Sequence, residues 1–110
     1  MRKQFLGSAF AAAALLALAP GVQAKNYGPG VTDTEIKIGN TMPYSGPASA
    51  YGTIGKAHAA YFKYINDQGG INGRKINYIS YDDGYSPPRT VEQTRKLVEQ
   101  DEVLLLMGQL

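Results

Sequence analysis

Short apolar stretches alternate with longer segments of helical periodicity along the chain, and this alternation restricts the fold more than any other feature. Strands are expected where apolar and polar residues alternate or where an apolar run is continuous, and helices where apolar residues recur every three or four positions. The expected order is strand 35–40, helix 53–68, strand 75–81, helix 87–100 and strand 103–107. Strands separated by helices of roughly 14 to 16 residues pair in parallel through right-handed crossovers. The sequence therefore predicts an α/β fold with an open, doubly wound parallel sheet.

Glycine and proline mark the ends of the expected elements. The pair Gly69-Gly70 is expected to end the first helix, and Asn72-Gly73 to form a tight turn before the second strand. Ser86 suits the N-cap of the second helix and Pro87 its first position. The residues expected to face the sheet are Ile54, Ala57, His58, Tyr61, Phe62 and Ile65 on the first helix, and Val91, Thr94, Leu97 and Val98 on the second.

Residues 1–24 have the pattern of a secretory signal peptide. Arg2 and Lys3 precede an uncharged apolar stretch, residues 5–19, and Ala24 is the small residue that signal peptidase requires. We expect cleavage after Ala24, which would leave residues 25–110 as the mature part and place it in the periplasm. An uncleaved membrane anchor is the alternative, but the apolar stretch is shorter than the ~20 residues that span a bilayer. No cysteine follows that could carry a lipid anchor.

Composition excludes several classes of partner and cofactor. The two basic residues of the leader account for the net charge of +2, so residues 25–110 are formally neutral and carry no basic stripe of the kind that binds nucleic acid. The chain has no cysteine and a single histidine, His58, so a Cys- or His-rich metal site is not expected. We therefore expect no nucleic-acid partner, no metal and no cofactor. His58 lies among apolar residues at helical spacing, which favours a packing role over a catalytic one.

The last expected strand, residues 103–107, is an uninterrupted apolar run of the kind found in strands buried on both faces. Such burial requires further strands and covering helices. We interpret residues 25–110 as the incomplete N-terminal piece of a longer protein, and we expect that this piece does not fold stably alone. The alternative is a small complete domain with an exposed apolar tail, which would be prone to aggregation.

In doubly wound sheets, ligands bind outside the carboxyl ends of the strands. The loops expected at that edge are residues 41–52, 82–86 and 108–110. The first is long compared with the usual connection of about two to six residues, and it leads into a helix N-terminus with free backbone N–H groups. A tyrosine side chain combines a large apolar face with a polar tip and suits a small organic ligand. The residues of the first two loops that we expect to bind a ligand are Tyr44, Ser45, Tyr51 and Tyr85.

Complete motifs for phosphate binding or catalysis are lacking. The segment around Gly55 resembles the end of a phosphate-binding loop, but Ala50 stands in place of its first glycine and Ala57 in place of the Ser or Thr. The nucleophile elbow Gly-x-Ser-x-Gly does not occur. Asp82-Asp83 could supply paired carboxylates, but neighbouring strand residues point to opposite faces. We therefore favour a role for this pair in ordering the loop and the following helix N-terminus, and we predict no catalytic residue.

Several short motifs follow one another in a specific order and spacing. They are Ile36-Lys37-Ile38-Gly39, Ser45-Gly46-Pro47, Tyr51-Gly52, Ile65-Asn66, Gly69 to Ile76, and Tyr81-Asp82-Asp83. In combination they resemble the leucine/isoleucine/valine-binding type of periplasmic solute-binding proteins, the receptor components of ATP-driven importers. The resemblance covers nearly all of residues 31–110.

This resemblance implies two α/β lobes joined by a hinge, with the solute bound in the cleft between them. Residues 25–110 would form the first part of the first lobe. The resemblance implies ligand contacts at Tyr51 and at Leu110, which follows Gln109, another candidate binding residue at the same edge. The groups that hold the carboxylate and ammonium of an amino acid would lie beyond Leu110. Tyr85 stands where some relatives have a cysteine, and a bulky side chain near the cleft argues against strict branched-chain specificity. The resemblance implies that relatives with this pattern also take aromatic acids, amides or urea-like solutes.

The expected function is that of a periplasmic receptor that binds an amino acid, or a related small carboxylate or amide, and delivers it to the membrane permease of an ABC importer. One alternative is the ligand-binding sensor domain of a signalling receptor with the same fold, which a transmembrane helix and a signalling domain further along the reading frame would reveal. A second is a secreted α/β hydrolase, which would need a nucleophile–base pair that these residues lack.

Overall fold

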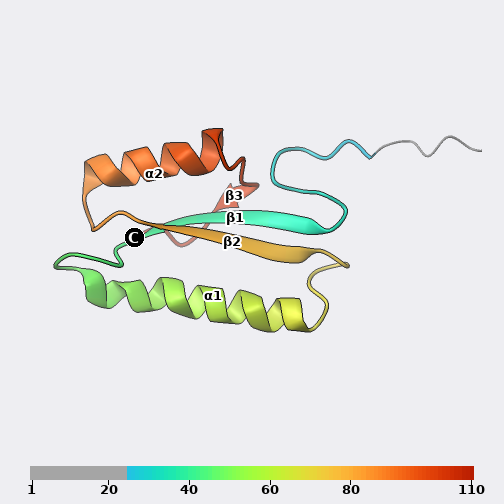
Figure 1. The fold of residues 1–110 in the computed structure, drawn as a ribbon, viewed down its shortest axis with the longest axis horizontal. Helices are drawn as coiled ribbons and strands as arrows, with labels where there is room; N and C mark the ends of the chain where they lie inside the picture. Colours follow the sequence, from blue (N-terminus) through green and yellow to red (C-terminus); the bar gives the residue numbers. More distant parts are fainter. Residues whose placement is uncertain (1–24) are drawn as a thin grey trace, which may run out of the picture.

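The computed structural model describes residues 25–110, so the expected signal peptide lies outside the described residues. Strands and helices alternate in the predicted order: β1 Glu35–Met42, α1 Gly52–Asp67, β2 Lys75–Asp82, α2 Pro87–Glu99 and β3 Leu105–Leu106, with a short 3-10 helix η1, Ser49–Tyr51, before α1. The strands form a middle layer between the two helices (Figure 1). In this part of the chain, no helix has the length and apolar character needed to cross a membrane.

The strands form one parallel sheet in the order β2-β1-β3. β1 and β2 pair along their whole length, from Glu35 opposite Lys75 to Met42 opposite Asp82. β3 joins the other side of β1, where Gly39 lies opposite Leu106. The predicted α/β class and parallel, doubly wound arrangement are confirmed, and both long strands extend slightly beyond their predicted ends.

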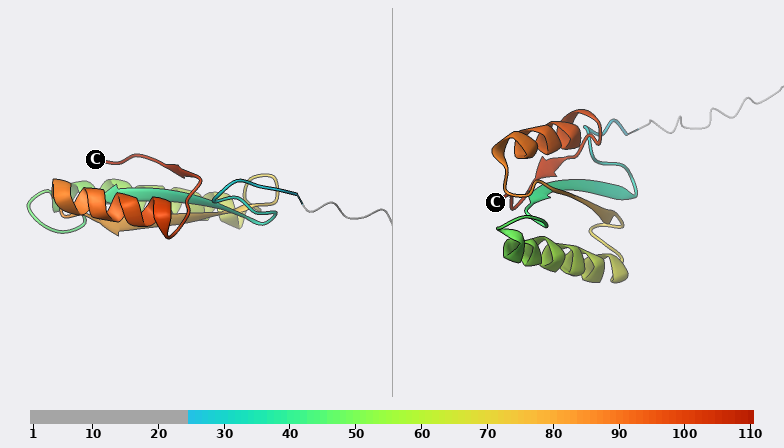
Figure 2. Two further views of the ribbon diagram at one scale, coloured as in Figure 1. Left: turned by 90° about the horizontal axis from the view of Figure 1, so that it is seen from above. Right: turned by 60° about the vertical axis from the view of Figure 1, so that its left-hand side comes forward.

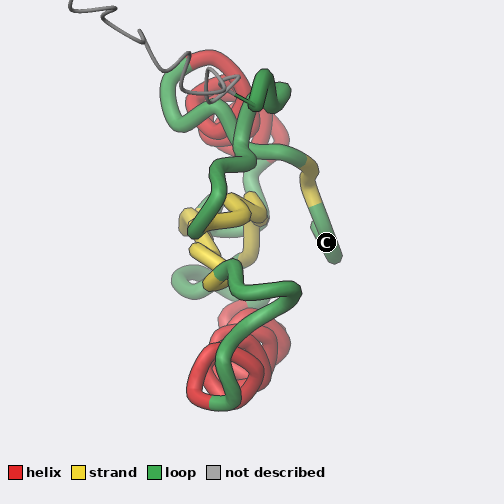
Figure 3. Tube along the Cα trace, turned by 90° about the vertical axis from the view of Figure 1, so that its right-hand side faces the viewer, coloured by secondary structure: helices red, strands yellow, loops and turns green. Residues whose placement is uncertain are grey.

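The two helices cover opposite faces of the sheet (Figure 3). α1 packs on the face that presents Tyr78, whose ring centroid lies 5.2 Å from that of Phe62. α2 packs on the other face, above Gly39, where an added Cβ atom would come within 3.2 Å of Leu97 Cδ2. The absence of a side chain at Gly39 therefore lets α2 approach the middle of the sheet closely.

The predicted end of α1 is confirmed. The N–H of Gly69 donates to the carbonyl of Asn66 at 3.1 Å, and the N–H of Gly70 to the carbonyl of Ile65 at 3.0 Å. These are the two bonds of a Schellman motif, which requires the positive φ that glycine tolerates. The tight turn predicted at Asn72-Gly73 is also present, with positive φ at both residues.

The buried face of α1 is rotated from the predicted one. Gly55 and Phe62 are buried, whereas Ile54 and Tyr61 are 39% and 59% exposed. The ring of Tyr44 lies directly against Gly55, where an added Cβ atom would fall 2.7 Å from Tyr44 Cζ. The helix thus approaches the rest of the fold along its glycines, and part of its apolar stripe remains uncovered within residues 25–110.

α2 differs from its prediction in a similar way. Leu97 is fully buried as predicted, but Val91 and Val98 are mostly exposed. α2 contacts the sheet through Leu97, so the valines on its flank remain at the surface. Ser86 occupies the N-cap and Pro87 the first position as predicted, although the Ser86 side chain makes no capping hydrogen bond.

The third strand differs most from its prediction. Strand pairing is limited to Leu105 and Leu106 instead of extending over 103–107. Leu104 and Leu105 are 46% and 44% exposed, so the burial on both faces, which was expected to depend on further strands and covering helices, is not reached within residues 25–110. Within residues 25–110 β3 has β1 as its single strand neighbour, which leaves its other edge uncovered.

Candidate functional site

Three segments meet at the carboxyl ends of the strands, on the left in Figure 1. They are the loop between β1 and α1, the loop between β2 and α2, and the segment that follows β3. Figure 2 shows that this last segment runs back toward the same edge as the other two. These are the loops in which the sequence places the candidate binding residues, and we refer to them together as the loop edge.

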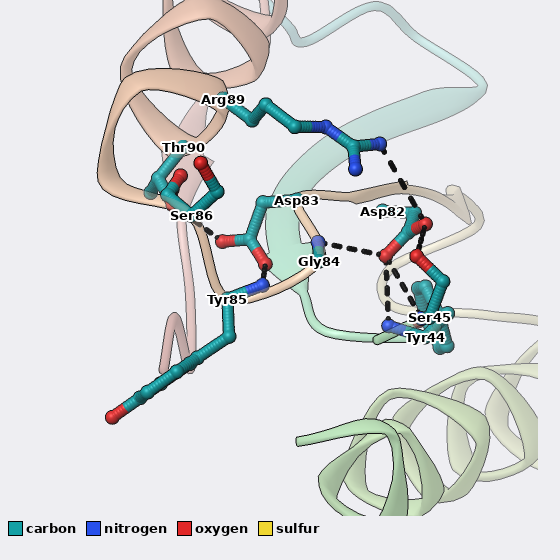
Figure 4. A network of polar contacts seen from close by, with 9 residues as sticks. All are labelled: Tyr44, Ser45, Asp82, Asp83, Gly84, Tyr85, Ser86, Arg89 and Thr90. Atoms are coloured by element: carbon teal, nitrogen blue, oxygen red, sulfur yellow. Dashed lines mark hydrogen bonds and ion pairs between the residues drawn. The ribbon is translucent and has the colours of Figure 1, made fainter. Parts of the chain in front are cut away.

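Asp82, the last residue of β2, holds the loop after β1 in place (Figure 4). Its Oδ1 atom accepts hydrogen bonds from the backbone N–H groups of Tyr44, Ser45 and Gly84 at 2.9, 3.1 and 3.0 Å. Its Oδ2 atom accepts the Ser45 hydroxyl at 2.5 Å and lies 3.8 Å from the Arg89 guanidinium. One carboxylate therefore fixes two loops and the first turn of α2 relative to one another.

These donors change the acidity of Asp82. The Ser45 hydroxyl has the largest influence, and together with the N–H groups of Gly84, Ser45 and Tyr44 it lowers the pKa of the carboxyl to about 2, against the opposing effect of burial. Asp82 is therefore ionised at neutral pH. A carboxylate with so many donors is suited to ordering a loop rather than to exchanging protons with a substrate.

Asp83 orders the loop after β2 and is fully buried. Its Oδ1 atom accepts the backbone N–H of Tyr85 at 2.9 Å, and its Oδ2 atom accepts the Thr90 hydroxyl at 2.6 Å. Tyr85 adopts a φ of 57°, and its ring points away from the network in Figure 4. Both acidic residues thus order loops, in agreement with the interpretation of this pair from the sequence.

The tyrosines of the loop after β1 differ in exposure. Tyr44 is half-buried against Gly52 and Gly55 of α1, and its Oη atom lies 2.5 Å from Ser80 Oγ. Tyr51, the last residue of η1, is 54% exposed. Tyr51 therefore presents open aromatic surface at the loop edge, whereas Tyr44 belongs to the framework that shapes the loop.

The segment after β3 carries the last two candidate residues. Gln109 Nε2 donates to the hydroxyl oxygens of Thr41 and Thr94, both at 3.2 Å. Leu110 is 47% exposed and borders a hollow of about 470 Å³. The other residues that line this hollow are Tyr85, Pro87, Thr90 and Val91. Tyr85 and Leu110, which come from different loops, thus face one surface depression.

A chain of polar side chains beneath the loop edge was not predicted from the sequence. Asn40 is fully buried, and its Nδ2 atom donates to the carbonyls of Met107 and Gly108 at 2.7 and 2.9 Å. The Ser80 hydroxyl donates to Asn40 Oδ1 at 2.9 Å. The one sign of this network in the sequence was a polar residue, Asn40, near the end of a strand. Its hydrogen-bond partners lie at least 40 positions away along the chain.

His58 has the packing role that the sequence predicted. It is half-buried, and its Nδ1 atom lies 3.3 Å from the hydroxyl of Tyr78. The described part of the chain holds no cluster of three or more His, Cys, Asp or Glu residues placed to bind a metal ion.

The loop edge offers aromatic and aliphatic surface beside ordered backbone, an arrangement suited to binding a small organic molecule.

Comparison with known proteins identifies the class of protein. The sequence model of the family described as "Periplasmic binding protein" matches residues 35–110. The Leucine-, isoleucine-, valine-, threonine-, and alanine-binding protein of Pseudomonas aeruginosa is 35% identical over 74 residues, which are 66% of this chain and 20% of that protein.

Solved structures agree with this match. A fatty acid ABC transporter substrate-binding protein from Thermomonospora curvata is similar with a TM-score of 0.64 and 32% identity, over 74% of this chain and 21% of that chain. A branched-chain amino acid transporter substrate binding protein from Streptococcus pneumoniae, solved in complex with isoleucine, is similar with a TM-score of 0.63 and 33% identity, over 68% of this chain and 22% of that chain.

In an open α/β sheet, ligands bind outside the carboxyl ends of the strands, which is where the loop edge lies. The chain belongs to the periplasmic binding protein family, whose members bind solutes and are not enzymes. Membership implies an extracytoplasmic location. The chain spans about one fifth of the length of the curated relatives that it matches.

Proposed function

We propose that residues 25–110 form the first part of the first lobe of a receptor that binds a small solute outside the cytoplasm and delivers it to the permease of an ABC importer. The solute would be an amino acid or a related small carboxylate or amide. The observation that supports this proposal is the exposure of Tyr51, Tyr85 and Leu110 at one edge of a framework fixed by Asp82 and Asp83. In a chain of this family, such a surface is suited to one wall of a solute cleft.

The proposed binding residues fall into two groups, one that would make apolar contacts with the solute and one that would make polar contacts. The rings of Tyr51 and Tyr85 and the side chain of Leu110 would cover the apolar part of the solute. Gln109 and the Ser45 hydroxyl would line the polar part of the cleft, and Tyr44 would support the loop after β1 from beneath. A second lobe would close on the bound solute and the solute would stabilise the closed form over the open one. The permease would bind this closed form.

We further propose that residues 1–24 are a cleavable signal peptide, removed after Ala24 during export to the periplasm. The charged start, apolar middle and small final residue of this segment support the proposal. Mass spectrometry of the exported protein would show an N-terminus at Lys25. An N-terminus at Met1 on the exported protein would contradict the cleavage.

A thermal-shift screen of the complete mature protein tests the binding function. The panel contains L-leucine, L-isoleucine, L-phenylalanine, benzoate, octanoate, acetamide and urea. A solute at 100 times its dissociation constant adds about 2.7 kcal/mol to the free energy of unfolding, which raises the melting temperature by a few degrees. A shift with leucine or isoleucine supports branched-chain transport, and a shift with benzoate alone supports an aromatic acid. No shift with any member of the panel would contradict the proposed solute class.

A further inference from the structure

The hydrogen bonds that join the polar side chains beneath the loop edge have one donor-to-acceptor direction. The carbonyl oxygens of Met107 and Gly108 can only accept hydrogen bonds, so the Asn40 atom that faces them is the NH2 group. Asn40 Oδ1 then faces Ser80, whose hydroxyl must donate to it. Because the single proton of Ser80 is used in this way, Ser80 Oγ accepts the hydroxyl of Tyr44 at 2.5 Å. Each group therefore donates to the next one: Tyr44 in the loop after β1 to Ser80 on β2, Ser80 to Asn40 on β1, and Asn40 to the carbonyls of the segment after β3.

This polar relay, Tyr44–Ser80–Asn40, is fully satisfied. Within residues 25–110, no buried side-chain nitrogen or oxygen atom lacks a hydrogen-bond partner. Burial raises the pKa of Tyr78, which lies on the same face of the sheet, so its hydroxyl stays protonated at neutral pH. Asn40 is fully buried, and Ser80 and Tyr44 are half-buried. A satisfied network of this kind is rigid, because each group that moved would leave a partner unpaired.

The segment after β3 depends on this relay for its position. The last backbone hydrogen bond from β1 to the segment, within residues 25–110, joins the Met107 N–H to the Gly39 carbonyl at 2.9 Å. Beyond this bond, the Asn40 amide holds the carbonyls of Met107 and Gly108. Gly108 has a φ of 58°, and an added Cβ atom would come within 2.8 Å of His58 Cε1. The backbone thus passes so close to α1 that a small displacement would disturb the path that leads to Leu110.

We propose that Asn40 is a positioning residue for solute binding: its amide clamps the backbone after β3 and thereby places Leu110 beside Tyr85 at the loop edge, with Gln109 held against Thr41 and Thr94. Asn40 itself is fully buried and does not touch the solute. The expected effect of Asn40 on solute affinity rests on the proposed function. The clamping of the segment after β3 by Asn40 can be measured without any solute.

The test compares Asn40→Asp with the wild type in the complete mature protein. An ionised carboxylate cannot donate to the two carbonyls, whereas a protonated carboxyl regains one donor. Burial beside carbonyl oxygens raises the pKa of the introduced carboxyl, so it gains its proton at mildly acidic pH. The surrounding titratable groups, His58 on α1, Tyr78 on β2 and Tyr44 in the loop, are common to both proteins. The ratio of variant to wild type at each pH therefore isolates the introduced group.

Two quantities are measured between pH 5 and pH 8. The first is amide hydrogen exchange of the segment that follows β3, and the second is the dissociation constant for L-leucine, L-isoleucine and benzoate. At pH 8 we expect the variant segment to exchange about tenfold faster and the probes to bind about tenfold more weakly, and we expect both ratios to fall at pH 5 without reaching one, because one of the two hydrogen bonds is restored. Ratios of one at every pH would overturn the proposal.

Asn66→Asp is the matched control. Asn66 also holds a neighbouring backbone, since its Nδ2 atom donates to the Ile76 carbonyl at 2.8 Å, but this contact lies at the amino end of β2, away from the loop edge. The Asn66→Asp variant should leave the ratios to wild type of the hydrogen-exchange rate and of the dissociation constant at one. An equal effect of Asn66→Asp on the segment after β3 would also overturn the proposal, because the change would then be global.

A second variant covers the case in which Asn40→Asp does not fold. Ser80→Ala leaves Asn40 in place but removes the hydroxyl that orients its amide, so exchange and dissociation should change in the same direction by a smaller factor. A Ser80→Ala protein that matches the wild type in both measurements would then overturn the proposal. If the wild type binds none of the three probes, hydrogen exchange alone decides the role of Asn40, and the proposed solute class is decided separately by the full thermal-shift panel.

Discussion

Ser45 Oγ donates a hydrogen bond of 2.5 Å to Asp82 Oδ2, and this contact joins the loop after β1 to the end of β2. The same carboxylate lies 3.8 Å from Arg89 at the start of α2. Parallel pairing of β1 and β2 brings Asp82 opposite Met42, so the carboxylate is level with the point where β1 ends and its loop begins. The shape of the loop edge therefore depends on strand register as well as on the loops themselves.

Acid should destabilise the protein partly through Asp82. Its pKa is lowered from the ordinary 3.8 to about 2 in the folded state, so its contribution to the free energy of unfolding is present above about pH 4 and is lost as the pH falls toward 2. Asp82→Asn should make the fall in the free energy of unfolding over this window shallower. Urea denaturation at several pH values measures the slope.

Asp67→Asn provides the control for this acid experiment. Asp67 lies 2.6 Å from Lys63 in an exposed ion pair, and exposed pairs contribute little to stability. The variant should show the wild-type slope between pH 4 and pH 2. An Asp82→Asn protein whose slope equals that of the wild type would show that Asp82 is not stabilised in the folded state.

Gly55→Ala should destabilise the protein although alanine favours helices. A Cβ atom at this position would fall 2.7 Å from Tyr44 Cζ, so the ring that is bonded to Ser80 would have to move. Overpacking of this kind costs about 1–3 kcal/mol, which exceeds the helix preference of alanine over glycine. In a Tyr44→Ala background the same change should cost less. A double-mutant cycle measures this difference, and purely additive effects would contradict the contact.

Thr90→Val should weaken the anchoring of the loop after β2. The Thr90 hydroxyl donates to the buried carboxylate of Asp83 at 2.6 Å, and hydrogen bonds to charged groups contribute about 1.5–3 kcal/mol. Chemical denaturation of the variant should show a loss of this size in the free energy of unfolding. Thr53→Val, at an exposed position of α1, should change stability much less. Equal losses in the two variants would argue against the Asp83 contact.

Local residue chemistry was enough to predict the order of the elements. Gly69, Gly70, Asn72 and Gly73 all have positive φ, as their positions at a helix end and a tight turn require. The apolar and polar alternation used to predict β1 and β2 likewise reflects a local rule, since successive side chains of a strand point to opposite faces of the sheet. These features depend on neighbouring residues, which is why one sequence suffices to predict them.

The packing of α1 and the polar relay could not be predicted in the same way. The apolar residues of α1 cover more than one face, and the buried face is decided by the contact between Gly55 and Tyr44. Asn40 and Ser80 are bonded across neighbouring strands, 40 positions apart. Such contacts depend on register and helix rotation, which local periodicity does not determine. Within residues 25–110 β3 pairs with β1 alone, so the further strands and helices on which the burial expected for 103–107 depends are not among the described elements.

The most direct test of solute binding at the loop edge is a calorimetric titration of the complete mature protein and two tyrosine variants with the solute that gives the largest thermal shift in the panel. Tyr51 and Tyr64 are 54% and 58% exposed, but Tyr51 lies at the loop edge and Tyr64 near the far end of α1. We expect that Tyr51→Ala weakens binding about tenfold or more, as truncation of an aromatic anchor does, and that Tyr64→Ala leaves the dissociation constant unchanged. Unchanged binding by Tyr51→Ala, or equal losses in both variants, would contradict solute binding at the loop edge.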